Sequence, residues 1–179
     1  MDLQETINQY MKKYPKSKLI LSNGVIEGIF VMGNNYTTKS SLYGAYPYGY
    51  LDRIYTLFKP IENKTLHLFS GSIEEEDGID RVDFKTGINA ESMSEILPEN
   101  HYERIYSDPP YSIEDCDHYG CCMVKRKECH KIMKKGGILI WLDQVLPNYR
   151  KIEFDIIGRI GMVKSTNHRF RVITIFKKK

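Results

Sequence analysis

The sequence predicts an α/β fold built on a mostly parallel sheet that ends in an antiparallel pair of strands. Short apolar runs recur through the second half of the chain, in an order that fits buried parallel strands. The last two runs, residues 154–163 and 169–176, lie close enough in sequence to pair as a hairpin. A composition of 41% hydrophobic and 27% charged residues is ordinary for a globular chain, and 179 residues favour one domain.

The first third of the chain predicts a helix, a hairpin and a second helix. Apolar residues three or four apart favour the first helix, and Asn23-Gly24 between two apolar runs tolerates the positive φ of a tight hairpin turn. A stretch rich in glycine, asparagine and tyrosine follows at residues 33–50, and such a stretch more often lines a surface than fills a core. The expected elements span residues 3–14, 18–30 and about 51–58.

The remaining elements are six strands and one helix. A basic amphipathic helix over residues 122–135 is expected to stop at Gly136-Gly137. Residues 70–78 leave room for one turn of helix at most between the first two strands of this region, and 88–92 could be the end of a further short strand. The strands are expected at residues 65–70, 80–84, 103–107, 137–146, 154–163 and 169–176.

Charge is distributed unevenly, although the formal net charge is only +3. Residues 125–179 carry fifteen lysines and arginines against four aspartates and glutamates. A basic C-terminal third suits a polyanionic partner such as nucleic acid, and an ordinary solvated surface explains it equally well. No apolar run approaches the roughly 18 residues of a membrane span, and the N-terminus has no signal-like apolar core, which predicts a cytoplasmic protein.

Four cysteines and a histidine crowd residues 116–130 without predicting a metal site. Zinc ligands are usually cysteine pairs separated by two to four residues on turns. Adjacent Cys121 and Cys122 suit one tetrahedral ion poorly, and the segment beyond them reads as helix. We therefore expect reduced, partly buried thiols and no metal.

Polar residues follow three of the expected strands where each strand ends. Ser70-Gly71-Ser72 follows the first, Asp83 ends the second, and Asp108 follows the third. In open α/β sheets, ligands bind beyond the carboxyl ends of the strands. A glycine there lets the backbone approach a ligand closely, and a strand-end acid can accept hydrogen bonds from ribose hydroxyls. This order of residues predicts a nucleoside-binding edge.

Asp-Pro-Pro-Tyr at residues 108–111 ends the third of these strands abruptly. Neither proline has a backbone N–H to donate, so the ladder stops and a rigid loop begins. The loop fixes the Asp108 carboxylate and the Tyr111 ring on either side of an inflexible segment. After a buried strand, and with a glycine turn and a strand-end acid upstream, this pattern favours a functional site over a plain polar turn.

The segment SDPPY directly after a strand resembles the catalytic motif of the S-adenosylmethionine-dependent amino-methyltransferases, especially those that act on adenine N6 in nucleic acids. LHLFSGS resembles their cofactor-binding loop, while GGILIWLDQVL and NHRFRVITIF resemble their fifth strand and final hairpin. The resemblance covers about residues 60–179, the expected cofactor-binding and catalytic core. It implies a Rossmann-like class I methyltransferase sheet with reduced helices, to which residues 1–59 add a small N-terminal β-hairpin extension within a single domain.

The resemblance also implies roles for individual residues. His168, just before the last strand, could line a base pocket or serve the fold. The implied catalytic residues are Asp108, Pro109, Pro110 and Tyr111. The implied contacts with S-adenosylmethionine are Phe69, Ser70, Gly71, Ser72 and the ribose-binding Asp83, with Asn89 or Glu91 toward the adenine and Asn35, Tyr36 and Tyr46 from the segment before the first motif.

In this family the carboxylate and the next backbone carbonyl, here those of Asp108 and Pro109, accept the two N–H bonds of an exocyclic amine. The nitrogen lone pair is thereby drawn toward the methyl sulfonium for direct in-line transfer. Tyr111 would stack on a base swung out of its helix. The expected reaction is methylation of a base amine in nucleic acid, most of all adenine N6 in DNA.

Two alternatives stay open at this point. No segment is large enough for a separate target-recognition domain, so target choice would fall to the tyrosine-rich stretch, the basic third or a partner subunit. Small methyltransferases without such a domain modify RNA bases, at guanine N2 or adenine N6. The cofactor loop retains only Gly71 of the usual glycine-rich repeat, which favours the second alternative, an inactive subunit that binds cofactor or nucleic acid.

Overall fold

The computed structural model describes residues 2–32, 46–69, 71, 73, 76–83, 86–119, 126–164 and 170–179. Its helices are α1 (Leu3–Lys13), α2 (Tyr50–Leu57), α3 (Ile113–Tyr119), α4 (Arg126–Ile132) and the short 3-10 helix η2 (Met93–Glu95). Its strands are β1 (Lys18–Ser22), β2 (Val25–Met32), β3 (Thr65–Leu68), β4 (Ile79–Val82), β5 (Tyr102–Ser107), β6 (Met133–Asp143), β7 (Phe154–Lys164) and β8 (Phe170–Lys178).

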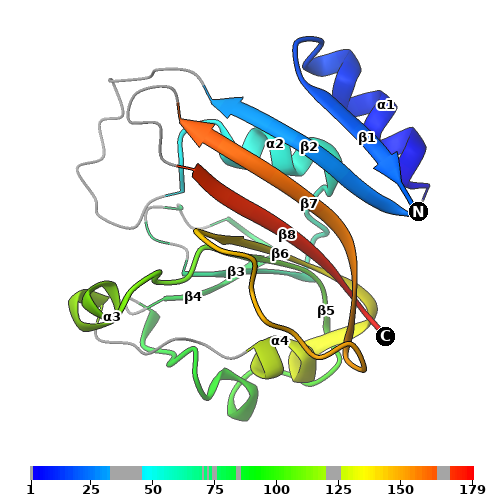
Figure 1. Cartoon of the computed structure of the whole chain (residues 1–179). Coiled ribbons are helices and arrows are strands. Elements are labelled where there is room, and N and C mark those ends of the chain that lie inside the picture. Colours follow the sequence, from blue (N-terminus) through cyan, green and yellow to red (C-terminus); the bar gives the residue numbers. More distant parts are fainter. Residues whose placement is uncertain are drawn as a thin grey trace.

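The strands form one eight-stranded mixed sheet in the order β1-β2-β7-β8-β6-β5-β3-β4 (Figure 1). β1 and β8 run antiparallel to their neighbours, and the other adjacent pairs are parallel. The predicted α/β class, with a mostly parallel sheet and an antiparallel C-terminal pair, is confirmed. As a result, the carboxyl ends of β3, β4, β5 and β6 lie along one edge.

The N-terminal hairpin turns where the sequence predicts and is part of the main sheet. Asn23 and Gly24 have φ values of 50° and 77°, which the tight turn requires. β2 pairs in parallel with β7, from Ile26 opposite Gly158 to Met32 opposite Lys164. The expected extension therefore continues the sheet beyond the C-terminal hairpin.

Two apolar clusters lie on opposite faces of the sheet, because successive strand residues point to opposite sides. On β6, Ile138, Ile140 and Leu142 belong to the first cluster, with α1 and α2, and Leu139 and Trp141 belong to the second, with α4 and η2. Figure 1 shows α1 and α2 beside β1 and β2. The segment leading into α2 therefore reaches the sheet on the face of the first cluster.

The helix predicted over residues 122–135 is wrong at its C-terminal end. α4 ends at Ile132, because Met133 already pairs with Tyr102 of β5 and begins β6. The register shifts between Tyr102 and Arg104, and Gly136 has a φ of +79° within the strand. The two glycines thus accommodate an irregularity in β6 and do not end a helix.

The expected strand end at residues 88–92 is also wrong. These residues form turns, and the Asn89 side chain accepts a hydrogen bond of 2.9 Å from the backbone N–H of Glu91. Such a local bond competes with a strand ladder. Within the described part of the chain, β4 is therefore the last strand on this side of the sheet.

Candidate active site

β3 ends in a sharp turn that points a backbone N–H at the next strand end. Phe69 and Gly71 both have positive φ, 61° and 57°. Positive φ is costly for a bulky non-glycine residue, so Phe69 holds a strained conformation of the kind that gathers at functional sites. The Phe69 N–H donates to the Val82 carbonyl at 2.8 Å, which ties the turn to β4.

The strand-end acid lies against this turn, as the sequence predicts. Gly71 N donates to Asp83 Oδ2 at 3.0 Å. Thr86 holds Asp83 in place, since Asp83 N donates to Thr86 Oγ1 at 3.0 Å and this hydroxyl donates to the Asp83 carbonyl at 2.8 Å. The glycine turn and the acid therefore form one local unit at the edge of the sheet. Ser70 and Ser72 lie outside the described residues.

The Asp108 carboxylate lies one strand away, directly after β5, with its side chain only 7% exposed. The Tyr111 hydroxyl donates to Asp108 Oδ1, and Arg171 Nη1 lies 3.9 Å from Asp108 Oδ2. Pro109 and Pro110 are both buried. The loop therefore presents a largely desolvated carboxylate held from two directions.

Tyr111 is held from its backbone as well as through its ring. Its N–H donates to Asp115 Oδ2 at 3.1 Å, and Asp115 N donates to Ser112 Oγ at 3.1 Å at the start of α3. Burial and the Asp108 carboxylate raise the pKa of Tyr111, so its hydroxyl stays protonated as a donor. The 108–111 loop is thus fixed between the end of β5 and the first turn of α3.

A cluster of four tyrosines and a histidine lies beside Asp108. We call it the tyrosine–histidine cluster; its members are Tyr46, Tyr50, Tyr55, His67 and Tyr106. The Tyr46 and Tyr50 rings stack with centroids 5.6 Å apart, and those of His67 and Tyr106 stack at 4.9 Å. The His67 ring nitrogens lie 3.4 Å from the Tyr46 hydroxyl and 2.9 Å from the Tyr55 hydroxyl. Burial raises the pKa of Tyr46 and Tyr50 well above the usual value, and the negative charge of Asp108 adds to the effect.

Tyr50 is a member of this cluster that the sequence does not single out. Its side chain is fully buried, and within the described part of the chain its hydroxyl has no hydrogen-bond partner. A buried polar atom without a partner is uncommon in folded proteins and often marks the place of a ligand or water. A tyrosine in a tyrosine-rich helix start carries no local signal that would identify it.

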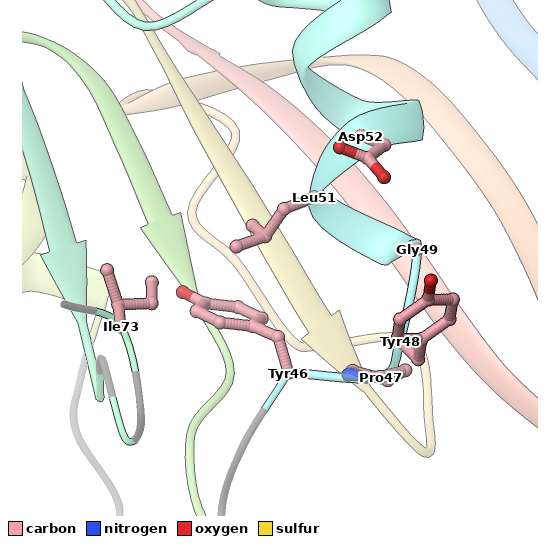
Figure 2. Close-up of a pocket in the computed structure, with 7 residues that line it drawn as sticks. All are labelled: Tyr46, Pro47, Tyr48, Gly49, Leu51, Asp52 and Ile73. Carbon is pink, nitrogen blue, oxygen red and sulfur yellow. The ribbon is translucent and has the colours of Figure 1, made fainter. Parts of the chain in front are cut away.

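A pocket of about 300 Å³ opens where the tyrosine-rich segment meets the turn after β3. Figure 2 shows the Tyr46 ring reaching toward Ile73 beneath Leu51. The walls are aromatic and aliphatic, and Asp52 supplies a carboxylate. This volume is at the lower end for small-molecule sites. The structure therefore brings the predicted Tyr46 to a pocket wall shared with the β3–β4 connection.

The other predicted contacts divide into two groups. Asn89 and Glu91 are exposed, and the Asn89 side chain is engaged in the local turn with Glu91. Asn35, Tyr36 and His168 lie outside the described residues, as do Cys121 and Cys122. Within the described ranges, no group of three or more His, Cys, Asp or Glu side chains is arranged to hold a metal. Burial raises the pKa of the Cys129 thiol to about 12.

Several basic residues of the C-terminal third are engaged within the protein. Lys178 is buried and donates to the carbonyls of His130 and Met133, each at 2.7 Å. Ion pairs of 2.9 to 3.0 Å hold Lys131, Lys134, Arg150 and Lys179 to acidic side chains. Part of the basic excess therefore serves the fold, and exposed side chains such as Lys127, Lys135, Lys151 and Lys177 are the ones available to a polyanion.

The chain matches no protein-family model, and no curated protein shows significant sequence similarity to it. In the described portion of the chain, the helices are too short or too polar to cross a membrane.

His67 makes folding stability depend on pH. Burial lowers the pKa of His67 to about 4, whereas an unfolded histidine titrates near 6.5. Between these values the unfolded chain binds a proton that the folded chain does not, so stability falls as the pH falls from about 6.5 to 4, by roughly 3 kcal/mol in total. Urea unfolding at several pH values should show this slope in the wild type and lose it in His67→Phe. Equal slopes in the two proteins would contradict the assignment.

Proposed function

We propose that the protein is an S-adenosylmethionine-dependent methyltransferase that acts on an exocyclic base amine of nucleic acid, most of all adenine N6 in DNA. The observation that carries the proposal is the Asp108 carboxylate, 7% exposed, at the carboxyl end of β5 and held by Tyr111 and Arg171. A weak amine nucleophile needs preorganised acceptors in a water-poor site. Asp108 and the Pro109 carbonyl, fixed by two prolines, are suited to that role.

The neighbouring strand ends support a cofactor site beside this acceptor. Asp83 and Gly71 form one unit after β4 and β3, and β3 is the direct neighbour of β5 in the sheet. In the proposal, the remaining acceptor capacity of the Asp83 carboxylate binds the ribose hydroxyls of the cofactor. The pocket at Tyr46, Leu51 and Ile73 offers apolar walls for the rest of the molecule.

The sheet order supports the finer fold proposal, a Rossmann-like class I methyltransferase sheet. The resemblance makes residues 137–146 the fifth strand and the last two strands a closing hairpin. In agreement with it, the reversed strand β8 lies directly between β6 and β7. With Asp108 after β5 and Asp83 after β4, the motif residues stand in the order along the edge that such a sheet requires.

An inactive subunit that binds cofactor or nucleic acid is the second candidate. It is favoured by the short edge next to the proposed cofactor site, since no described strand lies beyond β4. The Asp83 carboxylate is also already bonded to Gly71. Such a subunit would bind its ligands without methyl transfer and would serve an active partner.

The test is methyl transfer from labelled S-adenosylmethionine to duplex DNA, single-stranded DNA and RNA, followed by mass spectrometry of the product nucleosides. N6-methyladenine in DNA is the expected product. Methylated guanine N2 or adenine N6 from RNA alone would identify the RNA alternative. Cofactor binding by calorimetry without any product would favour the inactive subunit.

Asp83→Ala is expected to weaken S-adenosylmethionine binding by about 10- to 100-fold. The loss of hydrogen bonds to a charged group costs about 1.5–3 kcal/mol, which corresponds to that range. Isothermal titration calorimetry measures the dissociation constant, and Asp77→Ala removes an exposed acid from the same connection as a matched control. An unchanged constant in Asp83→Ala would remove this residue from the site.

A further inference from the structure

Arg171 stands at the polar end of an apolar row on β8. Alternate residues of a strand point to the same face, and the next two in this row, Ile173 and Ile175, are fully buried in the first apolar cluster. The Arg171 side chain is 17% exposed. A guanidinium in such a position loses much of its hydration, so its burial requires compensation by a partner.

The partners of Arg171 are two members of the 108–111 loop. Its Nη1 lies 3.9 Å from Asp108 Oδ2, and its guanidinium carbon lies 4.9 Å from the centroid of the Tyr111 ring. Because Tyr111 donates its hydroxyl to Asp108 Oδ1, the three side chains contact one another pairwise. A strand outside the motif thereby fixes both of its functional side chains.

We propose that Arg171 is a positioning residue of the Asp108 site, which holds the carboxylate and the Tyr111 ring in one arrangement. The guanidinium suits both contacts, since its charge attracts the carboxylate and its planar face stacks on an aromatic ring. At 3.9 Å the contact with Asp108 is ionic and not a short hydrogen bond. The catalytic consequence of this inference rests on the proposed methyl transfer, whereas the arrangement itself does not.

The surroundings of Asp108 explain why a cation matters there. Tyr111 from its own loop, and Tyr46 and Tyr50 from the segment that begins α2, bring neutral phenols to the carboxylate. Arg171 brings positive charge from β8. A nearby opposite charge favours the ionised form of a buried carboxyl group. Asp108 must be ionised to accept N–H bonds from a base amine with both oxygens.

The direct test follows the titration of Asp108 by carboxyl ¹³C NMR, with Asp108→Asn used to assign its signal. In Arg171→Met, which keeps an unbranched apolar side chain and removes the charge, the titration should move to higher pH. Arg171→Lys should restore part of the shift. Arg171→Gln supplies a second neutral variant should Arg171→Met not fold. An unchanged titration in the neutral variants would overturn the proposal.

Arg159→Met is the matched control. Arg159 lies on β7, next to β8, and its guanidinium is 4.0 Å from the Glu27 carboxylate on β2. Its replacement should leave the Asp108 titration where it is in the wild type. A shift as large as that of Arg171→Met would mean that any loss of charge on the sheet suffices, and would overturn the specific role of Arg171.

Activity measurements separate this inference from the proposed function. Arg171→Met should lower kcat more at acid pH than at alkaline pH and change the KM for S-adenosylmethionine little, with partial rescue in Arg171→Lys. If Arg171→Met shifts the titration but the wild type transfers no methyl group, Arg171 still positions Asp108 and the proposed function fails. If the wild type is active and Arg171→Met changes neither the titration nor kcat, the Arg171 proposal fails and the function stands.

Discussion

Asp108→Ala is expected to lower methyl transfer at least about 100-fold while leaving the affinity for S-adenosylmethionine nearly unchanged. Loss of one preorganised polar contact to the reacting group typically costs that much or more in rate. The cofactor is proposed to bind beside β3 and β4, so its affinity depends on other residues. Single-turnover transfer of a labelled methyl group measures the rate, and calorimetry measures the affinity.

Two further variants make this result interpretable. Asp108→Asn keeps the shape of the side chain and removes its charge, so it should also be strongly impaired but less prone to misfold. Asp117→Ala removes an exposed acid from the neighbouring helix α3 and should retain full activity. Full activity in Asp108→Ala would refute the catalytic assignment.

Tyr106→Ala is expected to lower the free energy of unfolding by about 3–5 kcal/mol, the usual cost of truncating a large buried aromatic side chain. Tyr106 is fully buried, stacks on His67 and contacts the Tyr55 ring at 5.1 Å between centroids. Truncation leaves a cavity below the tyrosine–histidine cluster. Because folded domains are stable by only about 5–15 kcal/mol, this one change removes a large share of the total.

Urea unfolding at neutral pH tests this expectation and separates the ring from the hydroxyl. The Tyr106 hydroxyl donates to the Phe58 carbonyl, so Tyr106→Phe should cost only about 1–2 kcal/mol, that of one buried hydrogen bond. The denaturant dependence of the free energy should be alike in all three proteins. A loss below about 1 kcal/mol in Tyr106→Ala would contradict the tight packing of this region.

The parts of the fold that were predictable depend on local chemistry. Asn23-Gly24 identifies a turn because few other dipeptides tolerate two positive φ angles. Asp83 and Gly71 are predictable as neighbours because both follow strands whose carboxyl ends meet at one edge. α3 was missed, although Ser112 followed by Asp115 three residues later is a recognisable helix start.

The errors and omissions arise from pairing between distant segments. Gly136-Gly137 is a reasonable helix stop by itself, and only the pairing of Met133 with Tyr102 makes it part of a strand. Strand alternation indicates that Arg171 faces inward, but not that the loop after β5 lies within its reach. Tyr50 likewise has no distinguishing neighbour in the sequence. These residues become visible only when the strand order is known.

The parallel pairing of β2 with β7 has a consequence for the order in which the protein can fold during synthesis. Ile26 finds its partner Gly158 only when nearly the whole chain has left the ribosome. Until then the early hairpin has an unpaired edge, which is a template for wrong association. Long-range pairing of this kind slows folding, because a large loop must close before any contact is gained. We therefore expect the nascent chain to need protection of that edge, and the Asp108 site to assemble last, when β8 brings Arg171 to its loop.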